Sequence, residues 1–200
     1  IVERNYFPNA IIDEGTLLII SSYSGNTEET LSYYKHASSF TKNIFGITSG
    51  GKLLKLLKND KHDYCLLPEG YPPRSILGYT LTVLIKLLDE DELLDLINID
   101  LLQEYSDKFS LEDSEVHDLA QKIHSTFPVI ITEEDLCSIG YRLKSQLNEN
   151  SKMLSYNVTL PEMNHNEIVG WQGKQVGKNI FSLLWIDISW PANIKRMDIT

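Results

Sequence analysis

A run of small hydroxyl side chains stands between an apolar stretch and an amphipathic one near the start of the chain. The run is Ser21-Ser22-Tyr23-Ser24-Gly25-Asn26-Thr27, preceded by Leu17 to Ile20 and followed by Leu31 to Phe40. That order predicts a strand, a loop and a helix. The loop then lies at a helix N-terminus, where unpaired N–H groups and the helix dipole favour an anion. With four Ser or Thr residues and one Gly in seven positions, the anion that this loop suits is a phosphate.

The same residues have a plainer interpretation. Asn26, with Glu29 three positions later, is an ordinary capping pair at a helix start. Serine and glycine before a helix can also mean no more than a turn and a cap. Spacing alone leaves both interpretations open.

Glu149 is a candidate general base. It falls at or just past the C-terminal end of a helix predicted over residues 136–148, whose apolar stripe includes Leu143 and Leu147. The helix dipole disfavours a charged carboxylate at this position. The placement is either accidental or it favours the protonated carboxyl, as suits a group that takes up a proton. The alternative is a surface glutamate paired with Lys152.

His165 and Arg74 are candidates for proton transfer and for charge stabilisation. His165 lies between two asparagines in the loop Pro161 to Trp171, and an imidazole can give and take protons near neutral pH. Arg74 follows two prolines that stiffen the chain, and a cation held on a stiff loop can clamp an oxyanion. The alternatives are a hydrogen-bonded loop histidine and a solvent-exposed cation at a helix start.

The bulk composition excludes several classes of partner. The chain has 200 residues, 42% hydrophobic and 23% charged, enough to bury a core. Its formal net charge of -10, without a basic stripe, argues against a nucleic-acid partner. No apolar stretch approaches membrane-spanning length, so we expect no membrane partner.

The cysteines and histidines give no sign of a metal site. Cys65 and Cys137 are far apart, and the five histidines show no ligand spacing, so we expect no metal and no cofactor. Two isolated cysteines suit a reducing compartment, and we expect a cytoplasmic protein.

Apolar strands alternate with helices along the chain. The strands are expected at residues 17–21, 43–48, 64–67, 128–132, 153–158 and 180–188, with Asn179 as the start of the last. The helices are expected at residues 28–40, 52–58, 76–88, 114–125 and 136–148, with an acidic, leucine-rich helical segment at 89–102. This alternation predicts an α/β fold with parallel sheets covered on both faces, and ligands at the carboxyl ends of the strands.

The alternation starts again in the second half, which predicts two domains, residues 1–106 and 107–200. The chain opens on Ile1 and ends at Thr200, soon after a strong strand candidate. We therefore expect a fragment of a longer protein, with each domain incomplete.

Four stretches resemble the bifunctional phosphoglucose/phosphomannose isomerase family, whose domains are of the sugar-isomerase (SIS) type. They are Ser22 to Thr27, Pro72 to Tyr79, Tyr141 to Lys152 and Pro161 to Trp171. The sequences of residues 146–152 and 164–171 are the most specific, and the resemblance runs from residue 13 to the end of the chain. It implies two SIS-type domains, each a three-layer α/β/α arrangement around a parallel sheet.

The resemblance also implies an activity and a role for each candidate. The family interconverts glucose 6-phosphate or mannose 6-phosphate with fructose 6-phosphate through an enediol or enediolate, without a metal. By that resemblance the phosphate is held by Ser22, Ser24 and Thr27. Glu149 moves a proton between C1 and C2, and Arg74 stabilises the enediolate oxygens. His165 helps to open the sugar ring and comes from the neighbouring subunit, which implies a homodimer.

The chain departs from the family pattern at both ends. The glycine-rich first phosphate loop is absent, and Lys195 stands too early to be the family's C-terminal lysine. Two other functions stay open: an SIS-fold sensor that binds a sugar phosphate without turning it over, and an amino-sugar isomerase. Glu149 and His165 discriminate against a sensor, which needs neither a base nor a group that opens the ring.

Overall fold

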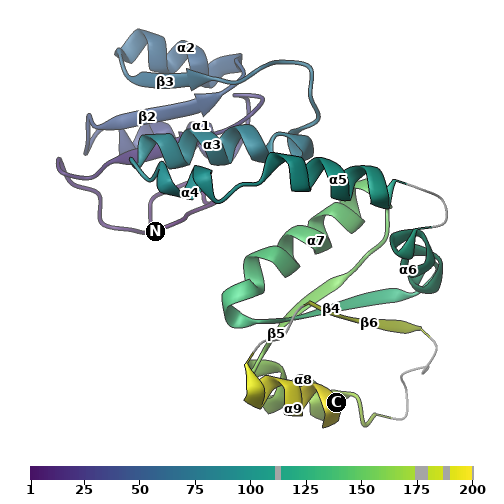
Figure 1. Ribbon diagram of the computed structural model, residues 1–200. Helices are drawn as coiled ribbons and strands as arrows, with labels where there is room; N and C mark the ends of the chain where they lie inside the picture. The colour runs from purple at the N-terminus through teal and green to yellow at the C-terminus, as the bar shows by residue number, and fades with distance from the viewer. Residues whose placement is uncertain (111–113, 174–179, 187–189, 200) are drawn as a thin grey trace. The chain divides into compact units, whose positions relative to one another are not determined.

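The computed structural model describes residues 1–110, 114–173, 180–186 and 190–199. The chain divides into two compact units, Ile1–Asn98 and Ile99–Thr200. Figure 1 shows both in ribbon form, and each is described by itself. The chain passes from one unit to the other between Asn98 and Ile99, which is earlier than the boundary predicted from the sequence between residues 106 and 107. The assignment of residues 1–106 and 107–200 to two SIS domains stays a prediction.

The described residues of the first unit form a three-stranded parallel sheet in the order β1-β2-β3. Its strands are β1 (Leu18–Ser21), β2 (Ile44–Thr48) and β3 (Asp63–Leu66). Its helical segments are α1 (Glu28–Ala37), α2 (Gly51–Asp60), the 3-10 turn η1 (Pro73–Ser75), α3 (Leu77–Leu87) and α4 (Glu92–Asp95).

Helices cover both faces of this sheet. On one face, Tyr34 of α1 and Leu53 and Leu57 of α2 bury themselves against Ile20 and Ile44. The opposite face carries a second cluster, in which Val83 and Leu84 of α3 join a core formed by the buried residues Ile47, Leu67 and Ile76. Because successive residues of a strand point to opposite faces, an apolar strand such as β2 supplies both clusters.

The described residues of the second unit form another three-stranded parallel sheet, in the order β5-β4-β6. Its strands are β4 (Phe127–Glu133), β5 (Tyr156–Leu160) and β6 (Phe181–Trp185). Its helical segments are α5 (Ile99–Phe109), α6 (Glu115–Ile123), η2 (Glu134–Leu136), α7 (Cys137–Asn150), η3 (Glu162–His165), α8 (Glu167–Gly170) and α9 (Pro191–Ile199). The predicted α/β fold with parallel sheets is thus confirmed.

The structure corrects several predicted boundaries. The acidic segment 89–102 is not one helix, because α4 ends at Asp95 and α5 begins at Ile99. The fifth strand begins at Tyr156 rather than Met153, since the N–H of Met153 donates to the carbonyl of Leu147 at 3.2 Å and so closes the end of α7. Asn179 and residues 187–188 of the predicted last strand lie outside the described residues. Among the helices that the structure describes, none combines the length and the apolar character needed to cross a bilayer.

Helix α7 lies unusually close to the sheet of the second unit at Gly140. A Cβ atom at this buried glycine would stand 2.7 Å from Cγ2 of Thr132 in β4 and would also overlap the side-chain amide of Asn157 in β5. That amide donates to the carbonyl of Ile130 at 3.1 Å, so it cannot move aside without losing a hydrogen bond. Gly140 therefore sets the distance between α7 and the sheet.

We expect Gly140→Ala to lower the free energy of unfolding by about 1–3 kcal/mol, because the added methyl group overpacks this contact. Alanine favours a helix over glycine by about 1 kcal/mol, which works in the opposite direction. Chemical denaturation measures the difference. Gly170→Ala is the matched control in the same unit, since a Cβ there meets nothing within 4 Å. A variant Gly140→Ala as stable as the unchanged protein would contradict the close contact.

Candidate functional site

The hydroxyl loop, residues 21–27, follows the carboxyl end of β1 and leads into α1. Ser22 is buried, and its N–H donates to the carbonyl of Ile47 at 3.0 Å, which holds the start of the loop to β2. The hydroxyls of Ser22 and Thr27 are 2.8 Å apart and share a hydrogen bond. Ser24 lies between them and is exposed.

Thr27 is the N-cap residue of α1, yet its side chain makes no capping hydrogen bond. Its hydroxyl contacts Ser22 instead, so the first N–H groups of α1 are not satisfied by the capping side chain. Such groups are available to an anion. Glu28 and Glu29 in the first turn oppose an anion through their own charge. Binding of an anion at this loop would therefore depend on neutral N–H and O–H donors.

Asn26 does not cap α1, so its interpretation as half of a capping pair with Glu29 is wrong. The N-cap position belongs to Thr27, one residue later. The side-chain amide of Asn26 donates to the carbonyl of Ser24, and its oxygen accepts from the N–H of Lys52, both at 3.1 Å. Asn26 thus joins the hydroxyl loop to α2.

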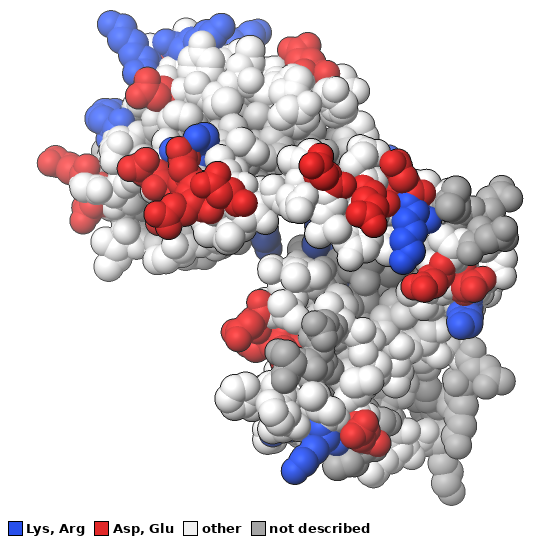
Figure 2. Space-filling view, viewed as in Figure 1, with Lys and Arg blue, Asp and Glu red and all other residues white. Residues whose placement is uncertain are grey.

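Positive side chains lie along α2, the helix whose first turn is bonded to Asn26 of the hydroxyl loop. Lys52, Lys55 and Lys58 are all exposed on that helix, and Figure 2 shows blue side chains gathered over it. Lys52 and Lys55 line a shallow groove with Lys35 and Glu28 of α1. These cations offset locally the negative charge of the chain as a whole.

Arg74 lies in η1, half buried, in a segment that is anchored to the hydroxyl loop. The anchor is Tyr23, whose hydroxyl donates to the carbonyl of Pro68 at 2.9 Å and accepts from the N–H of Tyr71 at 3.0 Å. The structure therefore ties the segment that carries Arg74 to the loop that carries Ser22, Ser24 and Thr27. All of these residues belong to the first unit.

Glu149 lies in the last turn of α7, in the second unit, and is exposed. The side chain of Lys152 donates to the backbone carbonyl of Glu149 at 2.7 Å. The expected contact between Glu149 and Lys152 thus exists, but through the main chain rather than through the carboxylate. The lysine satisfies one of the helix's last carbonyl groups, which is a common C-terminal arrangement.

His165 is the last residue of η3 and is exposed. The polar groups around it bond to one another: the side-chain amide of Asn166 donates to Glu162 at 2.9 Å, and Glu167 accepts from the hydroxyl of Tyr156 at 3.2 Å. Burial and, to a smaller extent, the hydrogen bond to Glu167 raise the pKa of Tyr156, so that its hydroxyl stays protonated and can donate. The loop is thereby fixed while His165 faces outward.

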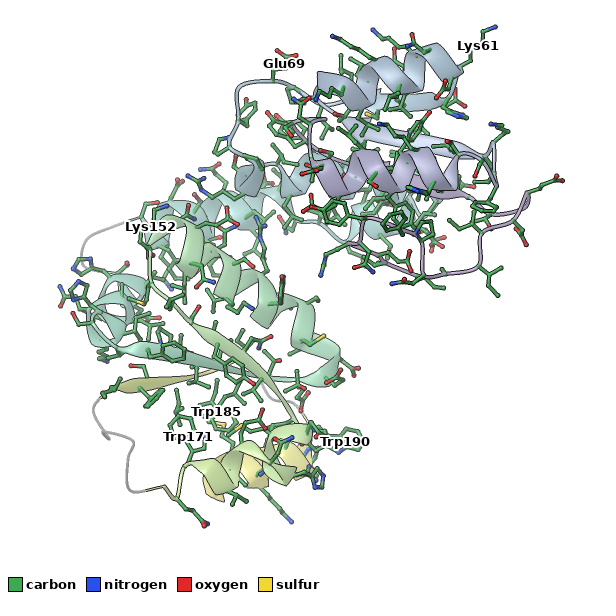
Figure 3. The ribbon with its side chains drawn as sticks, turned by 180° about the vertical axis from the view of Figure 1, so that it is seen from behind. Lys61, Glu69, Lys152, Trp171, Trp185 and Trp190 are labelled. Atoms are coloured by element: carbon green, nitrogen blue, oxygen red, sulfur yellow. The ribbon has the colours of Figure 1, made fainter. Side chains whose placement is uncertain are left out.

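The structure does not bring Glu149 and His165 together within one chain. Helix α7 connects the end of β4 to the start of the parallel strand β5, so Glu149, in its last turn, lies near the end of the sheet where β5 begins. His165 instead follows the end of β5. Five residues of strand separate these two ends by about 15 Å. Figure 3 shows Lys152, just after α7, at one end of the second unit and Trp190, whose backbone N–H donates to Glu133 at the end of β4, toward the other.

The remaining residues that could hold a metal do not form a cluster. Within the described part of the chain, no three His, Cys, Asp or Glu side chains gather as a metal site would require. Cys65 and Cys137 are both free and half buried.

Sequence reasoning did not include the loop after β2 in the site. The Ser49 hydroxyl and N–H donate to the carbonyl of Tyr23 at 2.6 and 2.9 Å, so this loop lies against the hydroxyl loop. Its Ser49-Gly50-Gly51 sequence, at the carboxyl end of a neighbouring parallel strand, was the available signal.

Comparison with known proteins points to one family. Residues 112–200 match the family model described as bacterial phospho-glucose isomerase C-terminal SIS domain. The whole chain is 35% identical to the bifunctional phosphoglucose/phosphomannose isomerase of Caldicellulosiruptor bescii and covers 63% of that relative. It is also 35% identical, over 86% of its length, to the D-glucosamine-6-phosphate 4-epimerase of Sulfolobus acidocaldarius, of which it covers 56%.

A solved structure supports the fold. The C-terminal domain of glucosamine-fructose-6-phosphate aminotransferase from Francisella tularensis matches 96% of this chain and 57% of its own, with a TM-score of 0.64 and 14% sequence identity. The chain spans less than two thirds of the length of the two curated relatives described above. The family model over residues 112–200 and the relative matched by the whole of this chain agree, so the chain is similar to the bifunctional phosphoglucose/phosphomannose isomerases, which contain SIS domains.

Proposed function

We propose that the full-length protein is an aldose–ketose isomerase that interconverts glucose 6-phosphate or mannose 6-phosphate with fructose 6-phosphate. The observation that carries this proposal is the 35% identity of the entire chain to a relative named for both activities. Because the chain covers 63% of that relative, the activity is proposed for the full-length protein rather than for these 200 residues alone.

The phosphate group of the sugar is assigned to Ser22, Ser24 and Thr27. The support is local: the Ser22 and Thr27 hydroxyls lie 2.8 Å apart at the start of α1, and Thr27 leaves the first N–H groups of that helix uncapped. Hydroxyls and N–H groups are the donors that loops at helix N-termini offer to phosphate.

The remaining candidates are assigned to proton transfer. His165 supplies a proton to the ring oxygen as the bond between C1 and that oxygen breaks, and the proton lost from the C1 hydroxyl returns to the imidazole. Glu149 then takes the proton from C2 of the aldose and returns it to C1. The negative charge that develops on the enediolate oxygen is stabilised by the Arg74 guanidinium. The proton on the C2 hydroxyl ends on the C1 oxygen, so the reaction balances without an oxidant and uses protons alone.

His165 of one subunit is assigned to the site that contains Glu149 of another. Within one chain the two residues lie at opposite edges of a sheet, so a shared site needs a second copy. The symmetric dimer is the commonest oligomer that supplies one. We place the protein in the cytoplasm, where two unpaired cysteines persist.

Two other functions are separable by experiment. A sensor that only binds a sugar phosphate needs the hydroxyl loop but neither Glu149 nor His165, and the relatives' names do not favour it. A 4-epimerase is the other candidate, because the epimerase of Sulfolobus acidocaldarius is as identical to this chain as the isomerase relative is, at 35%. Its product differs at C4 of the sugar, which the assay below detects.

We expect Glu149→Gln in the full-length protein to bind glucose 6-phosphate and lose about 10²–10⁴-fold in kcat, because the amide cannot accept the proton from C2. Exchange of the C2 proton with deuterated solvent, followed by NMR, measures the step directly.

Glu115→Gln, an exposed glutamate of the same unit, is the control and should keep full activity. Full activity of Glu149→Gln would remove this residue from the mechanism. Conversion of glucosamine 6-phosphate at C4, without C2 exchange in glucose 6-phosphate, would establish the epimerase instead.

Mixing two inactive full-length variants, Glu149→Gln and His165→Ala, should restore activity. Random exchange of subunits makes half of the dimers mixed, and each mixed dimer has one intact site, so about a quarter of the activity returns. Each variant incubated alone is the control. Exchange demonstrated by affinity tags without any recovery would show that the two residues do not share a site across subunits.

A further inference from the structure

We infer that Asn26 is a positioning residue that sets the geometry of the hydroxyl loop and orients the Ser24 hydroxyl toward a phosphate. The inference rests on the proposed phosphate site, and it adds a residue that makes no contact with the phosphate itself. It is drawn from the hydrogen bonds of Asn26 and from the contact between two glycine-containing loops.

Asn26 holds Ser24 from two directions. Its backbone N–H donates to the Ser24 hydroxyl oxygen at 3.2 Å, and its side-chain amide donates to the Ser24 carbonyl at 3.1 Å. A hydroxyl that accepts one hydrogen bond still has its own proton to donate. Asn26 therefore fixes Ser24 as a donor at the exposed side of the loop.

Asn26 also caps a helix to which it does not belong. The N-cap residue of α2 is Gly50, which has no side chain to offer. The oxygen of the Asn26 side chain accepts from the N–H of Lys52 in the first turn of α2 at 3.1 Å. One side-chain amide thus satisfies a donor of α2 and an acceptor of the hydroxyl loop at the same time.

The two loops touch backbone to backbone around this amide. The N–H of Leu53 donates to the carbonyl of Gly25 at 2.8 Å. Gly25 has φ of 63°, and a Cβ there would overlap the carbonyl of Gly50. Gly51 has φ of 72°, and a Cβ there would overlap the carbonyl of Ser24. The hydroxyl loop thus packs directly against the loop after β2, and the hydrogen bonds of Asn26 connect the two.

An amide is required because the position needs a donor and an acceptor together. Aspartate would still accept from Lys52 and would suit the N-terminus of α2, but it would face the Ser24 carbonyl with a second acceptor and add a negative charge beside the anion. Alanine would lose both bonds without adding charge. Asn26→Asp is therefore expected to be the more stable of the two variants, whereas Asn26→Ala is expected to bind phosphate more tightly.

The test measures inorganic phosphate binding by calorimetry and thermal unfolding in the full-length protein. Asn26→Ala should weaken phosphate binding on the order of tenfold, as for a displaced hydrogen bond to a charged group. Asn26→Asp should weaken it further, yet unfold at a higher temperature than Asn26→Ala because it keeps the cap on α2. Asn59→Ala, an exposed residue of α2, is the control and should bind phosphate like the unchanged protein.

Steady-state kinetics add a second readout. Both variants should raise KM for glucose 6-phosphate in proportion to the loss of phosphate affinity and leave kcat nearly unchanged, since the phosphate is held equally before and during the reaction. A phosphate affinity that follows the order of stability, or that Asn26→Ala leaves unaltered, would overturn the positioning role. So would a full-length protein that binds no phosphate.

The outcome is separable from that of the proposed function. Phosphate binding needs no turnover, so a protein that binds phosphate in the expected order but exchanges no C2 proton would refute the isomerase and retain the role of Asn26.

Discussion

The direction of the parallel strands decides which residues of this protein can meet. In each unit every described strand runs the same way, so the loops after the strands gather at one edge and the helices return to the other. The hydroxyl loop and the loop after β2 share an edge and touch. Glu149, at the end of a returning helix, and His165, after a strand, cannot share one. This separation is why the proposed site draws Glu149 and His165 from two chains.

Glycine makes the contact in the first unit possible. Gly25 and Gly51 both have positive φ, and both lie where a side chain would strike the backbone of the other loop. Only glycine combines this conformation with this proximity at low cost. The hydroxyl loop is consequently shaped both by its own hydrogen bonds and by a loop that lies more than twenty residues away in sequence.

The sequence was sufficient for the order of the strands and for the fold class, because short apolar runs that alternate with helices indicate buried parallel strands. It was sufficient for Ser114 as a helix start, since a serine that caps its own helix acts locally, here by accepting from the N–H of His117. It failed for Asn26, whose partner Lys52 belongs to another helix. It also failed for the start of β5, where a bond between Met153 and Leu147 extends the end of α7. Local rules predicted the Ser114 cap, whereas the error at Asn26 came from a bond to a residue 26 positions away and the error at β5 came from a bond that closes the end of the preceding helix.

The charge of the chain explains why the candidate phosphate site uses neutral donors. With a net charge of -10 and two glutamates in the first turn of α1, the field around the hydroxyl loop does not by itself attract an anion. Hydroxyls and N–H groups bind through geometry, so their orientation matters more than it would for flexible lysines, whose charge acts over a distance. The lysines of α2 offset part of the chain's negative charge, whereas holding an anion depends on donors that are already in place. A loop fixed by glycine contacts and by one side-chain amide meets that requirement, because little conformational freedom remains to be lost when the anion binds.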